Sequence, residues 1–131
     1  MTHDNARSNI AAMGVRLEMF ATEEHPRICG LGEVIFRTFD MGTEMYVVLD
    51  GEVELSIGEN VVETVGPGEP FGEMALIDQA PRTATATAKT PCKLAVITEK
   101  RFAFLVQTQP YFALEVMKVM ADRLRKMNAR A

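Results

Sequence analysis

Apolar side chains recur at helical spacing near the start of the chain. They form one stripe that comprises Ile10, Met13, Leu17 and Phe20. Ser8 or Asn9 stands where the cap of such a helix is expected. We therefore predict an amphipathic helix over residues 9–21 that buries this stripe, preceded by a polar and mobile segment at residues 1–8.

The pattern changes to short strands with frequent turns between residues 28 and 97. Glycines mark the expected turns at Gly30, Gly42, Gly51, Gly58 and Gly66. In the strand around Val53–Ile57, apolar and polar side chains alternate, which indicates that one face of the strand is exposed to solvent. A tight turn at residues 58–60 then leads to another apolar run, which predicts a hairpin. This density of strands and turns is typical of an antiparallel β-roll or jelly roll, so the fold class is mainly β with flanking helices.

Helical spacing returns after residue 98. We predict a short helix over residues 99–107 and a second helix that starts at Pro110, a residue favoured in the first turn, and runs to about Asn128. One stripe of the second helix has heptad-like spacing and comprises Leu114, Met117, Ala121 and Leu124. Adjacent positions carry Phe112, Val116, Met120 and Met127. So wide an apolar surface must be buried on more than one side, by the roll and by a second chain or a mobile lid.

Length and charge restrict the class of protein. The 131 residues fit a single domain, and the shares of 47% hydrophobic and 24% charged residues are those of an ordinary globular protein. A net charge of −4 argues against nucleic acid as a partner, and we interpret the basic residues of the last helix as a solvated face. No apolar run is long enough to span a bilayer, and no secretory signal is evident, so we expect a cytoplasmic protein without a membrane partner.

The cysteines and histidines do not indicate a metal site. Cys29 and Cys92 are isolated in the sequence, and we interpret both as buried structural residues. His3 and His25 share no predicted strand or helix face. A cupin-type metalloenzyme, which would use several histidine and carboxylate ligands from its strands, is therefore excluded, and no cofactor or metal is expected.

The segment from residue 71 to 88 combines a helix start, a carboxylate and a guanidinium. Gly72 permits close approach of a ligand to the backbone, and residues 73–78 have the composition of a short helix whose first N–H groups favour an anion. Pro81 ends that helix. Arg82 follows it with a planar fork that can meet two phosphate oxygens, whereas the Glu73 carboxylate suits a sugar hydroxyl.

This segment closely resembles the phosphate-binding cassette of cyclic nucleotide-binding domains, with Phe-Gly-Glu, Ala-Leu and Pro-Arg-Thr-Ala in order and at the family spacing. The similarity extends over about residues 28–126. One residue departs from the pattern: Phe39 stands where the family usually has a glycine in an acidic turn. Because phenylalanine tolerates a positive φ poorly, we expect that turn to be reshaped or strained.

The resemblance implies roles for particular residues. Arg82 would pair with the exocyclic phosphate oxygens, and Glu73 would accept a hydrogen bond from the ribose 2′-hydroxyl. Thr83 would add its amide and hydroxyl, and it is able to reach a guanine. The full predicted ligand-binding set is Gly72, Glu73, Met74, Ala75, Arg82, Thr83, Ala84, Leu55 and Val62, of which Leu55 and Val62 would touch the base; an equal interpretation is that these two are core residues.

The resulting hypothesis is a non-enzymatic sensor of cAMP or cGMP that relays binding through its last helix to a protein partner or a second copy. In the resembled regulators this helix leads into a helix-turn-helix DNA-binding domain, which this sequence lacks. The start at Met1 favours an independent chain. Two alternatives stay open: a nucleotide-free interaction module on the same roll, and the truncated effector domain of a transcription regulator.

Overall fold

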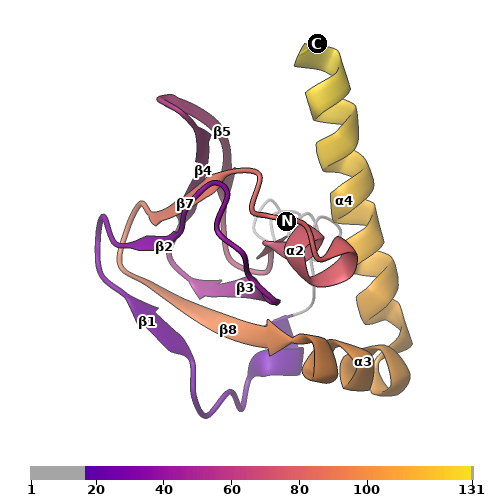
Figure 1. Cartoon of the computed structure of the whole chain (residues 1–131). Coiled ribbons are helices and arrows are strands. Elements are labelled where there is room, and N and C mark those ends of the chain that lie inside the picture. Colours follow the sequence, from indigo (N-terminus) through magenta and orange to yellow (C-terminus); the bar gives the residue numbers. More distant parts are fainter. Residues whose placement is uncertain (1–16, 131) are drawn as a thin grey trace, which may run out of the picture.

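The computed structural model describes residues 17–130, which form two antiparallel sheets with helices on one side (Figure 1). In chain order the elements are η1 (Leu17–Phe20), β1 (Arg27–Cys29), β2 (Val34–Phe36), β3 (Glu44–Asp50), β4 (Val53–Ile57), β5 (Asn60–Val65), β6 (Pro70–Phe71), α2 (Glu73–Asp78), β7 (Thr85–Ala88), β8 (Cys92–Thr98), α3 (Glu99–Thr108) and α4 (Pro110–Arg130). One sheet has the strand order β1-β8-β3-β6 and the other β2-β7-β4-β5. The predicted fold class is confirmed.

The core consists of two layers that share strand β3. Tyr46 and Val48 face the cluster between the two sheets, together with Ile35, Val53 and other residues of the second sheet. Met45 and Val47, which alternate with them, face a second cluster on the helical side. Side chains of a strand point alternately to opposite faces, so the unbroken apolar run of β3 reflects burial on both faces.

The helices cover the outer face of the β1-β8-β3-β6 sheet. Their contribution to the second cluster is Phe20, Leu76, Leu105, Phe112 and Val116. Helix α3 begins after the capping residue Thr98, whose side chain accepts a hydrogen bond from the Arg101 N–H at 3.2 Å. Helix α4 begins at Pro110, as predicted from the sequence, because a proline in the first turn gives up no helical hydrogen bond.

The predicted N-terminal helix lies largely outside the described residues. Of its stripe, Phe20 is buried in the second cluster, and the described part is one turn of 3-10 helix, Leu17–Phe20, rather than α-helix. No helix within residues 17–130 is both long and apolar enough to cross a membrane.

Candidate functional site

The predicted cassette is formed by β6, α2 and the segment that leads into β7. Helix α2 has the bounds predicted from the sequence, Glu73–Asp78, and begins after Gly72. Gly72 adopts a left-handed conformation with φ 78°, and a Cβ there would lie 2.8 Å from Nη1 of Arg82. Both the backbone conformation and the close approach of the guanidinium therefore require glycine at this position.

Arg82 is a buried cation held by the main chain. Only 5% of the residue is exposed. Its Nη1 donates to the carbonyl oxygen of Gly72 at 3.0 Å and its Nη2 to that of Glu44 at 2.8 Å, while the guanidinium carbon lies 4.1 Å from the centroid of the Phe36 ring. These contacts fix the plane of the guanidinium before any ligand arrives.

Arg82 takes part in none of the six ion pairs in the described part of the chain, although the charges of Glu44, Asp40 and Glu73 favour its protonated form. Its Nε is buried without a hydrogen-bond partner. Burial lowers the pKa of Arg82 because the charged form loses its hydration. A buried guanidinium in this condition is destabilising on its own and favours an anion beside it.

The turn that carries Phe39 is strained rather than reshaped. Phe39 has φ 75°, and 83% of the residue is exposed. Two backbone hydrogen bonds hold it there: its N–H donates to the carbonyl oxygen of Arg82 at 2.8 Å, and the Arg82 N–H donates to that of Asp40 at 2.8 Å. The left-handed residue is thus paired directly with the main chain of the phosphate-binding candidate.

Glu73 is buried like Arg82 but contacts a different arginine. Arg123, from α4, donates through Nη1 to Oε1 of Glu73 at 2.5 Å, through Nε to both carboxylate oxygens of Glu63 at 2.9 and 3.0 Å, and through Nη2 to the carbonyl oxygen of Pro70 at 2.6 Å. Burial raises the pKa of Glu73, and the Arg123 charge opposes that rise only in part. The C-terminal helix is therefore bonded to the cassette.

The remaining predicted ligand-binding residues differ in exposure and in location. Ala75 is buried, Met74 and Thr83 are exposed, and Ala84 is half-buried in the bend before β7. Leu55 pairs with Glu63 across the β4–β5 hairpin and packs against the core between the sheets, and the half-buried Val62 lies where that hairpin changes register. The structure gathers the cassette residues around Gly72, whereas these two lie on the adjacent hairpin.

The prediction that the basic residues of the last helix form a solvated face is wrong for Arg123, whose side chain is 13% exposed and contacts Glu73. Two other basic residues of α4 form ion pairs along the helix: Lys118 pairs with Glu115 at 3.7 Å, and Lys126 pairs with Asp122 at 3.1 Å. No local signal distinguished Arg123 from these neighbours, because its partners are 50 to 60 positions away in the sequence.

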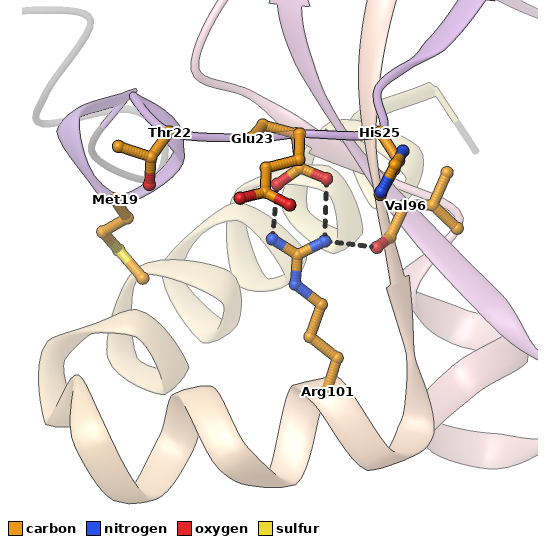
Figure 2. Close-up of a pocket in the computed structure, with 7 residues that line it drawn as sticks. Met19, Thr22, Glu23, His25, Val96 and Arg101 are labelled. Carbon is orange, nitrogen blue, oxygen red and sulfur yellow. Dashed lines mark hydrogen bonds and ion pairs between the residues drawn. The ribbon is translucent and has the colours of Figure 1, made fainter.

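A hollow of about 400 Å³ lies elsewhere, between the η1–β1 connection and the junction of β8 with α3. Two of its charged groups already pair with each other, as Figure 2 shows: Arg101 donates to both carboxylate oxygens of Glu23, and also to the carbonyl oxygen of Val96. None of its lining residues belongs to the cassette. Within residues 17–130, no group of three or more histidine, cysteine, aspartate or glutamate residues is placed to hold a metal ion.

The structure defines a protein of the β-roll class, with a buried arginine beside a short helix, and known proteins of similar sequence share this fold. The cyclic nucleotide-binding domain model matches residues 27–109, and the chain belongs to this family. The cyclic AMP receptor protein of Thermus thermophilus is 33% identical over 105 residues, which are 76% of this chain and 49% of that protein.

Two solved structures are similar in fold. The catabolite activator protein of Thermus thermophilus has a TM-score of 0.72 and 30% identity, with 81% of this chain and 52% of that chain covered. A structure from a cyclic-GMP-dependent signalling pathway that regulates bacterial phytopathogenesis has a TM-score of 0.64 and 30% identity, with 87% and 89% covered. The chain spans 27% to 49% of the length of the first curated relatives.

Proposed function

We propose that this chain is a non-enzymatic sensor that binds a 3′,5′-cyclic mononucleotide, cAMP or cGMP, at the cassette and relays its occupancy through α4. The observation that carries the proposal is the buried Arg82 guanidinium, which has no carboxylate partner among the described residues and whose Nε has no acceptor. The single negative charge of a cyclic phosphodiester would offset this buried positive charge.

The neighbouring carboxylate supports a ribose in the same site. Glu73 is acceptor-only when ionised, and a carboxylate has lone pairs for more donors than the one Arg123 nitrogen that it binds. Glu73 is thus suited to accept from a 2′-hydroxyl while Arg82 meets the phosphate. With Glu73 so committed, the other carboxylate of the cassette is Asp78, which is exposed at the end of α2 and poorly placed as a base, and this is the reason to propose a sensor and not a hydrolase.

The contact of Arg123 with Glu73 supports the relay. A ligand that bonds Glu73 alters the strength of the Arg123 contacts, and α4 carries Arg123. The coupling would be the difference in ligand affinity between two arrangements of α4, commonly about 1–3 kcal/mol.

The outward face of α4 supports a second copy of this chain as the receiver. Leu114, Met117 and Leu124 are between 42% and 56% exposed, and with Ala121 they keep the three-and-four spacing of a heptad. Phe112 and Val116 on the opposite face are buried against the roll. Two such stripes would pack as a coiled coil.

Both cyclic nucleotides remain candidates for the ligand. One similar protein is named as a cyclic AMP receptor, and another belongs to a cyclic-GMP-dependent pathway. Thr83, which directly follows Arg82 and is exposed, permits a contact to guanine and does not exclude adenine.

Calorimetric titration of the purified chain with cAMP, cGMP, AMP and a cyclic dinucleotide tests the proposal. We expect saturable binding of at least one 3′,5′-cyclic mononucleotide. Removing one partner of a buried charge pair costs roughly 2–5 kcal/mol, so Arg82→Ala should weaken binding at least about thirtyfold. Arg82→Lys, which keeps the charge and loses the fork, should also bind weakly, whereas Arg37→Ala, at an exposed position, should bind like the parent.

If no cyclic mononucleotide binds and none raises the melting temperature, the proposal is wrong and the nucleotide-free interaction module takes its place. Binding to the Arg82→Ala variant with unchanged affinity would instead show that the ligand site is not this cassette.

A further inference from the structure

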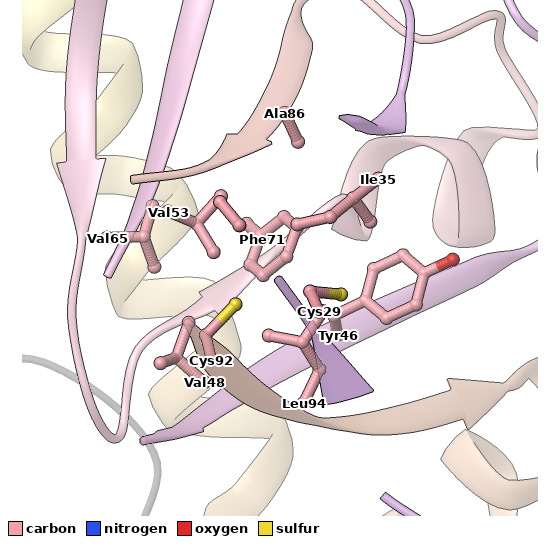
Figure 3. Packing of buried hydrophobic residues seen from close by; sticks show 11 residues of the cluster. Cys29, Ile35, Tyr46, Val48, Val53, Val65, Phe71, Ala86, Cys92 and Leu94 are labelled. Carbon is pink, nitrogen blue, oxygen red and sulfur yellow. The ribbon is translucent and has the colours of Figure 1, made fainter. Parts of the chain in front are cut away.

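The two cysteines, which are isolated in the sequence, meet across the first sheet. The antiparallel register of β1 and β8 sets Cys29 directly opposite Cys92, although 63 positions separate them. Both residues are buried, as predicted, but their pairing across the sheet was not evident from the sequence. Their exposed fractions are 1% and 3%, and they lie in the cluster between the sheets, where Figure 3 shows their sulfur atoms among Tyr46, Val48 and Leu94.

The spacing of directly opposed residues suits a covalent bond. Opposed Cβ atoms of an antiparallel pair lie about 4.5–5.5 Å apart, and a disulfide requires roughly 3.5–4.5 Å. The approach needed is thus on the order of an ångström, and it occurs at strand ends, because Cys29 is the last residue of β1 and Cys92 the first of β8. Both thiols are free in the structure.

Opening of the edge strand gives a small oxidant access to these thiols. β1 is three residues long, pairs only with β8 and lies at the edge of its sheet. Its central residue, Ile28, is 62% exposed, so little apolar contact holds the strand. Short edge strands of this kind open locally without unfolding the domain.

Cys29 is the thiol that lies on the strand that opens. Burial raises the pKa of both thiols, to about 11 for Cys92, and the charge of Arg27 opposes this rise at both positions whereas that of Glu33 adds to it. The thiolate is the nucleophile in oxidation, so the reaction would begin at Cys29 during opening of β1.

We propose that Cys29 and Cys92 are a modification site, which hydrogen peroxide converts to a reversible intramolecular disulfide. The Cys29 thiolate attacks one peroxide oxygen, the O–O bond breaks, and a sulfenic acid forms with release of hydroxide, which is protonated to water. The Cys92 sulfur then attacks the Cys29 sulfur, the S–O bond breaks, and a second water leaves. Two thiols and one peroxide thus give one disulfide and two waters.

The bond would enclose the part of the chain that holds the cassette. The segment between the two cysteines contains β2 to β7, α2 and Arg82, and the cysteines share their cluster with Phe71, the residue before Gly72. A cross-link that closes so long a loop restricts the unfolded chain, and we expect a rise in melting temperature on the order of 10 °C.

The test treats the whole chain with hydrogen peroxide under native conditions, followed by denaturation in an alkylating reagent and mass spectrometry. We expect a monomer lighter by two hydrogen atoms that no longer reacts with the reagent, a Cys29–Cys92 linked peptide in a digest, and full reversal by dithiothreitol. Cys92→Ala and Cys29→Ala each keep one thiol and should give neither the linked peptide nor the rise in melting temperature.

Three outcomes would overturn the proposal. The first is addition of two or three oxygen atoms to either cysteine in the parent chain, which marks sulfinic or sulfonic acid instead of a disulfide. The second is a disulfide between two chains. The third is full alkylation of both thiols after a peroxide treatment that lasts long enough for β1 to open, as judged by hydrogen exchange of its amides.

Discussion

Arg123 connects the last helix to the cassette, and its removal should free the end of that helix. The side chain makes hydrogen bonds to Glu63, Glu73 and the carbonyl oxygen of Pro70, and it is only 13% exposed. Beyond Val119, no described α4 side chain is fully buried. The Arg123→Ala variant therefore loses the main contact that holds residues 121–130 against the roll.

The structure sets the size of the effect. Breaking a buried ion pair by removal of one partner costs about 3–5 kcal/mol, because the other charge stays buried without its counter-ion. Glu73, 5% exposed, is left in this condition, whereas Glu63 is closer to solvent. Even the lower figure corresponds to a change of about 150-fold in the equilibrium between the attached and detached helix end.

Amide hydrogen exchange measures that equilibrium residue by residue. We expect protection of residues 121–127 to fall by about two orders of magnitude in Arg123→Ala, with residues 112–117 much less affected because Phe112 and Val116 are buried. Arg125→Ala is the matched control, since Arg125 is exposed on the same helix and appears in no ion pair of the described residues. Equal exchange in the parent and in Arg123→Ala would refute the reasoning.

Three further perturbations have expected outcomes. Phe39→Gly should raise the free energy of unfolding by about 0.5–1 kcal/mol, since relief of the positive φ exceeds the entropy cost of glycine. Phe39→Ala is the control, because alanine keeps the Cβ and therefore the strain. Equal melting temperatures for the two variants would contradict this explanation. Burial raises the pKa of Glu73 in the native state above its ordinary value of 4.5, which applies to the unfolded state. Between these two pKa values the native state binds more protons than the unfolded state, so the free energy of unfolding should fall as the pH rises through this window. Urea unfolding at several pH values should show Glu73→Gln without this contribution, and an identical pH dependence in both proteins would rule the explanation out. The double variant Leu114→Glu, Met117→Glu places charges on the exposed stripe of α4 and should convert a dimer to a monomer in analytical sedimentation. A parent chain that is itself monomeric would contradict this expectation.

The sequence predicted those elements whose signal is local. The bounds of α2 followed from Gly72 and Pro81, and the start of α4 followed from Pro110, because glycine and proline restrict the backbone at their own positions. The strain at Phe39 was predictable for the same reason. The two-sheet roll followed from turn spacing and from strand patterns that report burial on one face or on both.

The contacts between distant segments were beyond such reasoning. Arg123 and Glu73 are 50 positions apart, and nothing in the sequence distinguished Arg123 from Arg125, which points to solvent on the same helix. The pairing of Cys29 with Cys92 depends on the register of β1 against β8, and register is fixed by the packing of the whole sheet. Residues 9–16 of the predicted N-terminal helix lie outside the described residues, so that part stays a prediction.

The two buried charges of the site differ in a way that links it to α4. Arg82 is held by main-chain carbonyls and the Phe36 ring and forms no ion pair within residues 17–130, whereas the Glu73 carboxylate is compensated by a cation from the last helix. Under the proposed function, a ligand would supply the charge that Arg82 lacks and would also share Glu73 with Arg123. Thermodynamic reciprocity then applies: the factor by which the ligand changes the attachment of α4 equals the factor by which attachment of α4 changes the affinity for the ligand. The coupling free energy can be measured in two ways: from amide exchange of residues 121–127 with and without nucleotide, and from nucleotide affinity with α4 attached and detached. The two measurements must give the same value, and unequal values would exclude Arg123 as the link.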